Sequence, residues 1–172
     1  MPVWVAASAC AAMNALLGKA FCAEQLLMLP DNQKELFVTV SSASCLSSVN
    51  AGFAIAHCES NLGLDITRNL EIWTFVTWQE SCVHSLDSQE CTQDSWLEIV
   101  AGQGVGKYED SGELCISDFA KKLFEINLHP LVPSDSSIKL EIVFPKGVDL
   151  ALRTSNRAFG VVDGLALIGT QA

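Results

Sequence analysis

Three glycines at alternating positions are the first feature of this sequence that could do chemistry. They are Gly102, Gly104 and Gly106, and they follow a strand-like stretch. Glycine tolerates positive φ, so such a run lets backbone amides approach an anion closely. Neither standard phosphate motif fits, because Lys107 stands where a dinucleotide fingerprint needs its third glycine and a Walker A loop needs a longer spacing. The run predicts either an anion-binding loop or a tight structural turn. We expect Gly104 to lie in a loop beside a concave surface, outside regular secondary structure.

A second cluster combines two arginines with hydroxyl and amide side chains. Arg153 and Arg157 flank Thr154, Ser155 and Asn156. A guanidinium group presents five N–H donors in a planar fork that matches a carboxylate. The cluster therefore predicts a carboxylate-binding site. The same arginines at the end of a helix would instead complement its macrodipole, and the composition alone fits both interpretations.

The segment 65–69, Asp-Ile-Thr-Arg-Asn, is a third candidate, just before another strand-like stretch. Asp65 could accept a proton or hold a cationic group, although Asp-x-Thr before a strand is also ordinary turn chemistry. Nearby, His57 adjoins Cys58 and Glu59, which raises the alternatives of a metal site and a Cys–His nucleophile. No second pair of ligands at metal spacing accompanies them in the sequence, so we expect an inert thiol at the end of a strand.

Composition limits what these clusters can belong to. Of the 172 residues, 49% are apolar and 17% are charged, which is enough for a folded core. Ten basic and 20 acidic side chains give a net charge of −10, which disfavours nucleic acid or an anionic membrane as a partner. Seven cysteines at irregular spacing, without a Cys-x-x-Cys pair, predict mostly small buried hydrophobic residues in a reducing compartment.

The N-terminal stretch is apolar but does not have the pattern of a secretory signal. Its first basic residue, Lys19, follows the apolar run, whereas a signal peptide has positive charge before it. The run is also shorter than a membrane-spanning helix needs. We therefore expect a soluble, cytoplasmic protein.

The elements that must position these clusters mix helix and strand patterns. Helical spacing predicts a helix over 6–21 with Ser8 as N-cap, and a second over 117–127 with Ser117 as N-cap. Strand patterns cover 36–40, 52–57, 70–78, 96–101 and 138–144, and the stretches 41–50 and 80–95 are expected to be connections. The buried side of the last strand is expected to hold Ile138, Leu140, Ile142 and Phe144. Because several strands follow one another directly, we predict an α+β fold with a mixed sheet and helices packed on it.

These segments, in this order, resemble the family of cobalt-precorrin-5B C1-methyltransferases, the CbiD family. The most specific match is 147–171, similar to the family's Glu-Leu-Ala-x-x-Thr-x-Asn-x-x-x-Gly-(Ile/Val)-Val-x-Gly-(Ile/Leu)-x-(Ile/Leu)-(Ile/Leu)-Gly-Thr signature. Residues 102–106 look like its Gly-Gly-x-Gly-Val-Gly loop, with Ala101 replacing the first glycine. Residues 65–67 look like its Asp-Val-Thr segment, and 9–12 like the cysteine and alanines of its first helix. Cys58 and Glu59 stand where the family commonly has a Lys-Asp pair.

The resemblance implies a fold and an activity. It implies that 1–172 is the N-terminal region of a larger two-domain α/β protein, without the family's opening Gly-Tyr-Thr residues and its C-terminal half. It also implies S-adenosylmethionine-dependent methylation of C1 of cobalt-precorrin-5B to cobalt-precorrin-6A, in anaerobic cobalamin (vitamin B12) biosynthesis. The alternative is an inactive truncated remnant that binds a corrinoid or a partner protein.

The resemblance further implies roles for the candidate residues. The cosubstrate S-adenosylmethionine would be approached by Gly102, Gly104 and Gly106. The anionic corrinoid would be contacted by Arg153, Asn156, Arg157, Asp65 and Thr67, with Lys107 and Arg68 as further basic groups. Cobalt would arrive as part of the substrate, so the resemblance implies no metal site on the protein. It leaves the catalytic residues unassigned.

Overall fold

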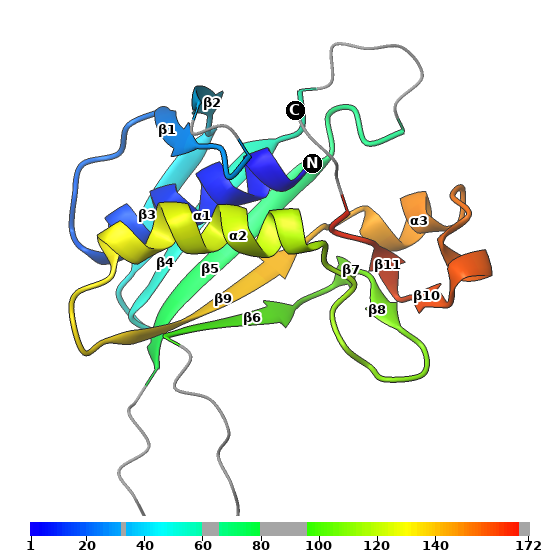
Figure 1. Cartoon of the computed structure of the whole chain (residues 1–172). Helices are drawn as coiled ribbons and strands as arrows, with labels where there is room; N and C mark the ends of the chain where they lie inside the picture. Colours follow the sequence, from blue (N-terminus) through cyan, green and yellow to red (C-terminus); the bar gives the residue numbers. More distant parts are fainter. Residues whose placement is uncertain (32–33, 60–65, 80–95, 169–172) are drawn as a thin grey trace, which may run out of the picture.

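The computed structural model describes residues 1–31, 34–59, 66–79 and 96–168. A five-stranded β-sheet lies at its centre, and helices α1 and α2 lie side by side across one face of that sheet (Figure 1). The predicted α+β class, with a mixed sheet and helices packed on it, is confirmed. In chain order the elements are α1 (Pro2–Leu16), β1 (Glu24–Met28), β2 (Glu35–Thr39), β3 (Ser42–Leu46), β4 (Ala51–His57), β5 (Glu71–Gln79), β6 (Leu97–Ala101), β7 (Gly104–Val105), β8 (Lys107–Tyr108), α2 (Asp118–Leu128), η1 (His129–Leu131), β9 (Ser137–Val143), α3 (Gly147–Ala151), η2 (Asn156–Phe159), β10 (Val161–Val162) and β11 (Gly164–Leu165).

The strands of the main sheet have the order β3-β4-β5-β9-β6. Neighbouring strands are antiparallel except for β9 and β6, which run parallel. All five predicted strands form within one residue of their expected bounds, as β2, β4, β5, β6 and β9. Two of the longer strands were not predicted, and neither were the two-residue strands β7, β8, β10 and β11. β1 pairs with β2 in a separate two-stranded sheet, and β3 lies in the stretch 41–50 that we expected to be a connection.

The reason that β3 was missed is its place at the edge of the sheet. Of its five residues only Ala43 is even partly buried. A strand with so little burial needs no apolar alternation, so its sequence gives no period-2 signal. β9 shows the opposite case, because its alternate residues face the helices. Ile138, Leu140 and Ile142 are buried, as is Phe144 just beyond the strand, and this prediction is confirmed.

Helix α1 lies unusually close to β4. A Cβ atom added at Gly52 would be 1.9 Å from the backbone oxygen of Ala12, so only glycine permits this approach. The predicted bounds 6–21 were wrong, since the helix begins at Pro2, and proline is well suited to a first helical turn. Ser8 is not an N-cap. It is buried within the helix, where its hydroxyl shares a 2.8 Å hydrogen bond with Thr74 of β5.

The start of α1 was misplaced because the helix is apolar on nearly every side. Twelve of its fifteen residues are buried, so no change from polar to apolar residues marks where it begins. Within the described ranges, neither α1 nor any other helix is long and apolar enough to cross a membrane.

Helix α2 begins as predicted. The Ser117 hydroxyl accepts a hydrogen bond from the backbone N–H of Ala120 at 3.2 Å, which satisfies one free donor of the first turn. At the other end, the Asn127 side chain accepts a hydrogen bond from the N–H of Met28 and donates one to its carbonyl, at 2.7 and 3.0 Å. This pair of bonds joins α2 to β1.

A smaller unit adjoins the main sheet where β9 and β6 end (Figure 1). In it, β7 pairs in parallel with β11, β8 pairs antiparallel with β10, and α3 packs against β7 and β11. The unit contains the glycine loop 102–106 and the arginine cluster 153–157, which the sequence separates by almost fifty residues.

We expect Leu140→Ala to lower the free energy of unfolding by about 2 to 5 kcal/mol, because it removes buried methyl groups and leaves a cavity. Lys139→Ala, on the other face of the same strand, is the control and should change it by no more than about 0.5 kcal/mol. Urea unfolding measures both values, and equal effects would contradict the assignment of the two faces.

Candidate active site

Four strands of the main sheet begin or end at the same end of the sheet, and the segments that connect them lie there. β4 ends at His57, and its antiparallel neighbour β5 begins at Glu71 at the same end. β9 and β6 also finish there, at Val143 and Ala101. The turn before β5, the glycine loop after β6 and the segment after β9 therefore all lie at this end (Figure 1).

Thr67 belongs to the turn before β5. Its hydroxyl lies 3.8 Å from the thiol of the buried Cys58. Since β9 separates β5 from β6, usual strand spacing puts this turn roughly 10 Å from the glycine loop. Thr67 thus lies at the same end of the sheet as the glycine loop, but the two are not in contact. Asp65, predicted to act with it, lies outside the described residues.

The glycine loop is packed against the backbone of two other segments. A Cβ atom at Gly104 would lie 2.1 Å from the Phe144 carbonyl oxygen. Added at Gly147 or Gly164, it would lie 2.1 or 2.0 Å from the carbonyl oxygen of Gly104. We call Gly104, Gly147 and Gly164 the glycine contact. No side chain fits at any of the three positions, so glycine is what lets β7, α3 and β11 touch.

Gly104 therefore differs from the sequence expectation. It is buried in the two-residue strand β7, with a φ of +78°, and it pairs with Gly164. The expectation of a loop position outside regular structure was wrong, because the close approach that glycine permits here is to the protein's own backbone.

The amides of this loop are largely used within the protein. The N–H of Gly102 donates to Ile142 at 2.8 Å, that of Val105 to Gly102 at 3.3 Å, and that of Gly106 to Leu165 at 2.8 Å. These three donors are not directed at a ligand. Gly104 and Gly106 are buried, whereas Gly102 is half-buried and Gln103 is exposed, so residues 102–103 are the part of the loop that is open to solvent.

The arginine cluster is joined to the glycine contact by Asn156. Its side-chain NH₂ donates to the carbonyl of Gly164 at 3.3 Å. Arg153 and Arg157 are exposed, and neither makes an ion pair with any residue that the structure describes. A salt bridge to Asp163 or another acid within this part of the chain thus does not account for them. Both guanidinium groups are available to a ligand.

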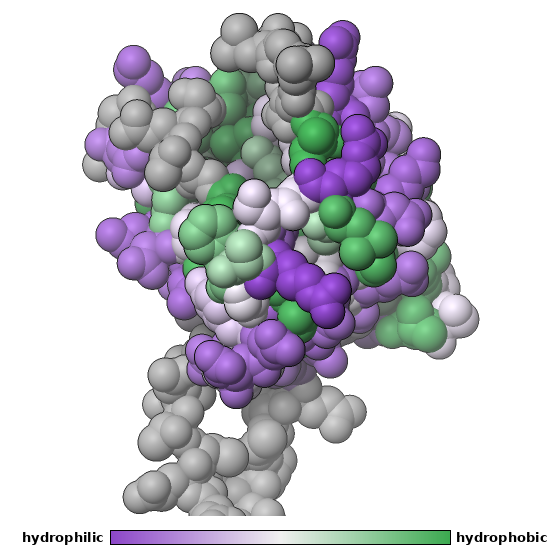
Figure 2. All heavy atoms as spheres, turned by 90° about the vertical axis from the view of Figure 1, so that its right-hand side faces the viewer, coloured by the Kyte–Doolittle hydropathy of each residue, from purple (hydrophilic) through white to green (hydrophobic). Residues whose placement is uncertain are grey.

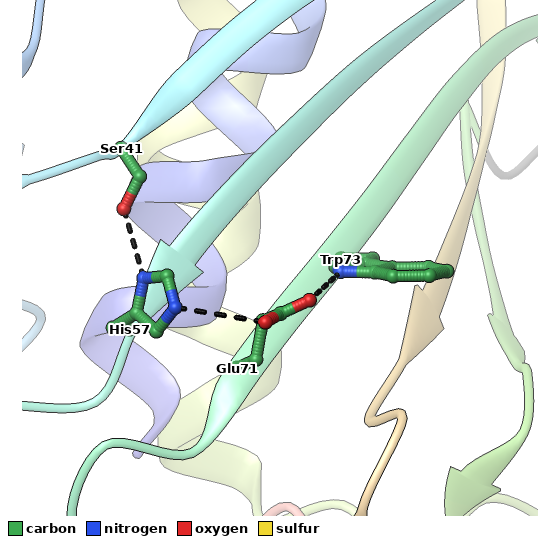
Figure 3. Close-up of polar contacts among 4 residues, drawn as sticks. All are labelled: Ser41, His57, Glu71 and Trp73. Carbon is green, nitrogen blue, oxygen red and sulfur yellow. Dashed lines mark hydrogen bonds and ion pairs between the residues drawn. The ribbon is translucent and has the colours of Figure 1, made fainter.

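A polar network beside this end of the sheet was not identified from the sequence (Figure 3). The Nδ1 of His57 is 2.8 Å from the hydroxyl oxygen of Ser41, and its Nε2 is 3.7 Å from a carboxylate oxygen of Glu71. The indole N–H of Trp73 donates to the same carboxylate. The network holds the Trp73 indole through Glu71 and links the His57 imidazole to the Ser41 hydroxyl by a hydrogen bond. The period-2 spacing of Glu71 and Trp73 predicts that both lie on one face of a strand. Their contact with His57 could not be predicted, because it depends on the register of β4 and β5.

This network shows where the ring nitrogens of His57 point relative to Cys58. The two ring nitrogens of His57 face Ser41 and Glu71, whereas the Cys58 thiol is buried near Thr67. Among the described residues no group of three or more His, Cys, Asp and Glu could hold a metal ion. The geometry fits the inert thiol that we expected rather than a nucleophile activated by histidine.

Of the five described cysteines, Cys10, Cys58 and Cys115 are buried, and Cys22 and Cys45 are exposed. Three of these five are buried, which agrees with the prediction that most of the cysteines are. Burial raises the pKa of Cys10 to about 12, because the thiolate would lose its hydration. That thiol therefore stays protonated, and unreactive, at physiological pH.

Comparisons with known proteins bear on what this site belongs to. The family model described as CbiD matches residues 1–172, the whole chain. The chain belongs to the CbiD family. Cobalt-precorrin-5B C(1)-methyltransferases of Prochlorococcus marinus strain MIT 9303 and Synechococcus sp. strain CC9902 are 54% and 48% identical to it over all 172 residues. The chain covers 45% and 44% of those two relatives, so this CbiD unit spans less than half of their length.

A solved structure shows the same fold. It is the cobalamin biosynthesis protein (cbiD) from Archaeoglobus fulgidus, which matches 98% of this chain with a TM-score of 0.69 and 21% sequence identity. The match covers 50% of that protein. The CbiD unit described here thus corresponds to half of that solved chain.

We expect Gly104→Ala to destabilise the protein far more than Gly112→Ala does. Both residues have positive φ, at +78° and +70°, so an alanine is strained at either one. A Cβ at Gly112 meets nothing within 4 Å, whereas at Gly104 it meets the Phe144 backbone. The difference in unfolding free energy isolates the clash and should be at least about 2 kcal/mol. Equal losses in urea unfolding would show that the glycine contact is looser than described.

Alkylation by iodoacetamide at pH 8 should distinguish the cysteines. Cys22 and Cys45 are exposed and should react within minutes in the folded protein. Cys10 should react only after unfolding, because it is buried and its pKa is about 12. Peptide mass spectrometry measures each site, and labelling of Cys10 as fast as Cys22 would contradict the packing of α1.

Proposed function

We propose that this CbiD unit forms part of an S-adenosylmethionine-dependent methyltransferase that methylates C1 of cobalt-precorrin-5B. The observation that carries the proposal is the 54% identity, over the whole chain, to a cobalt-precorrin-5B C(1)-methyltransferase. The geometry supports it, since the candidate cosubstrate loop and the candidate substrate-binding arginines belong to one small unit at one end of the sheet.

The reaction mainly requires that the sulfonium methyl group and the nucleophilic ring carbon are held in line. A nucleophilic ring carbon attacks the methyl group of the sulfonium, a new C–C bond forms, and the S–CH₃ bond breaks with its electron pair returning to sulfur. S-adenosylhomocysteine is the leaving group. The sulfonium is already activated, so the protein contributes by holding the two reactants in line and by excluding water.

We assign the cosubstrate to the reachable part of the glycine loop. Gly102 and Gln103 lie at the surface, and the half-buried Lys107 follows on β8 with a positive charge. Gly104 and Gly106 then shape the loop from behind, because both are buried and the Gly106 amide is already bonded. The Gly102 amide is bonded as well, to Ile142, so we assign the contact to the accessible edge at Gly102 and Gln103 rather than to that N–H, with Gly104 and Gly106 supporting the loop.

We assign the corrinoid carboxylates to Arg153 and Arg157. Each is exposed and without an ion-pair partner among the described residues, so binding a carboxylate breaks no existing salt bridge. Asn156 holds this segment to Gly164 and can still use its side-chain oxygen. Thr67 approaches the substrate from the turn before β5, and Asp65 stays a predicted contact. Cobalt enters as part of the substrate.

The first test is a thermal-shift titration of the chain with S-adenosylhomocysteine and with a cobalt corrinoid that has free carboxylates. Binding to the folded state stabilises it by RT ln(1 + [L]/Kd), so the melting temperature rises with the logarithm of the ligand concentration once that exceeds Kd. The proposal predicts a rise with each ligand. A rise with the corrinoid alone would instead indicate a corrinoid-binding remnant, and no rise with either would leave the unit without the proposed role.

We expect Arg153→Lys to weaken corrinoid binding by roughly tenfold, because lysine replaces a two-pronged contact with a point charge. The affinity for S-adenosylhomocysteine and the melting temperature should stay the same. Lys121→Gln, which removes a charge from the exposed side of α2, is the control and should change neither affinity. Loss of both affinities together with stability would show that Arg153 is structural.

A further inference from the structure

Three carboxylates of the main sheet lie on the face opposite to helices α1 and α2, and one of them differs from the others. Glu71 of β5 accepts the indole N–H of Trp73 (Figure 3). Glu98 of β6 accepts a hydrogen bond from the side-chain NH₂ of Gln79 at 2.5 Å. Glu141 of β9 makes no side-chain hydrogen bond or ion pair with any residue that the structure describes. Its carboxylate is therefore available to a ligand.

Glu141 lies directly beside the part of the glycine loop that is open to solvent. A Cβ atom added at Gly102 would lie 3.1 Å from a carboxylate oxygen of Glu141 and 2.5 Å from a methyl carbon of Val143. Glycine at position 102 thus keeps the space next to this carboxylate clear of a side chain. Lys139, two residues earlier on the same face, makes no ion pair with Glu141. A ligand at Gly102 and Gln103 comes within reach of the carboxylate.

The polarity of this edge of the loop is the reverse of that of an anion site. The N–H groups of Gly102, Val105 and Gly106 donate to carbonyl oxygens of the protein. What stands beside the open edge is a carboxylate without a described partner, which accepts hydrogen bonds and attracts positive charge. The net charge of −10 acts in the same direction, because the overall field favours a cation over an anion.

Apolar groups stand beside this carboxylate. Val143 is the register partner of Trp73 on β5, and both lie on the same face of the sheet as Glu141. Figure 2, which looks at the end of the molecule with β7 and α3, shows hydrophobic groups next to hydrophilic ones there as well. Within the described ranges no group of three or more His, Cys, Asp and Glu could hold a metal ion. One carboxylate with apolar neighbours suits an organic cation better than a metal ion.

S-adenosylmethionine has the charge that suits this edge. Its ammonium and sulfonium groups are positive and its carboxylate is negative, so the molecule is a net cation. An ammonium group presents three N–H donors, and its hydrogen bonds to a carboxylate are roughly twice as strong as neutral ones. We propose that Glu141 binds the α-ammonium group of the cosubstrate at the open edge of the glycine loop, which rests on the proposed function because the cosubstrate is taken from there.

The test compares two ligands on two proteins by isothermal titration calorimetry. The ligands are S-adenosylhomocysteine, which keeps the α-ammonium group, and its deaminated analogue, in which hydrogen replaces that group. The unsubstituted chain should bind the analogue at least about tenfold more weakly, because a charged hydrogen bond is lost. Glu141→Gln should bind S-adenosylhomocysteine at least about tenfold more weakly, and should bind the two ligands within about twofold of each other.

The control is Glu98→Gln, which removes one negative charge from the same face of the sheet. Glu98 stands four residues before Gly102, about 13 Å along an extended strand, where salt screens an exposed charge. Its affinity for S-adenosylhomocysteine should stay within about twofold of that of the unsubstituted chain. Since glutamine has the size of glutamate, the melting temperature should be the same in both variants, which separates lost binding from lost folding.

Several results would overturn the inference. Glu141→Gln could bind S-adenosylhomocysteine as tightly as the unsubstituted chain does. It could also bind weakly and still prefer that ligand to the deaminated analogue by the original factor, which would place the carboxylate on another group, such as the ribose. In both cases the unsubstituted chain binds the cosubstrate product, so the proposed function stands. If the unsubstituted chain binds neither ligand, the proposed function fails, and the role of Glu141 fails with it.

Discussion

The contact among Gly104, Gly147 and Gly164 is the constraint on which the candidate site depends. It joins three segments through their backbones, at distances where a single added Cβ would clash. Gly104 follows β6 and Gly147 follows β9, so the contact joins the segments that leave two neighbouring parallel strands, and β11 pairs with β7 beside it. The arginine segment lies within this closed path, between α3 and β11. Without the contact, nothing in the main sheet would hold that segment near the glycine loop.

Most of the longer strands and helix α2 could be predicted, because an element that buries one face shows a regular apolar pattern in its sequence. The alternation in β9 and the Ser117 cap of α2 are local signals, and the structure has both. The start of α1 and the existence of β3 could not be predicted for opposite reasons. Burial on all sides of α1 removes the amphipathic pattern that marks a helix boundary, and exposure along β3 removes the pattern that marks a strand.

The candidate site was harder to predict, because the type of a residue does not reveal which group it contacts in the folded protein. A glycine that permits close approach has the same sequence signal whether the approach is to an anion or to another backbone, and only the fold shows that Gly104 meets Gly164. The same holds for His57 and Glu71. They are fourteen residues apart in sequence, and they become neighbours only through the register of β4 and β5.

Charge and packing have separate roles in this account. The chain has a net charge of −10, so its overall field repels an anionic corrinoid. Under the proposed function, the attraction for a carboxylate therefore has to come from local arginines, and Arg153 and Arg157 have no ion-pair partner in the described part of the chain. The glycine contact fixes where those arginines stand, because Asn156 ties their segment to Gly164.

Hydrogen exchange measured by mass spectrometry tests the central claim most directly, since it reports where on the backbone a ligand acts. The account predicts that S-adenosylhomocysteine slows exchange in peptides covering 102–108 and 145–168, and leaves 24–46 unchanged. Protection confined to 24–46, or none in the two site segments at saturating ligand, would contradict the claim that the sheet end closed by the three glycines is the binding end.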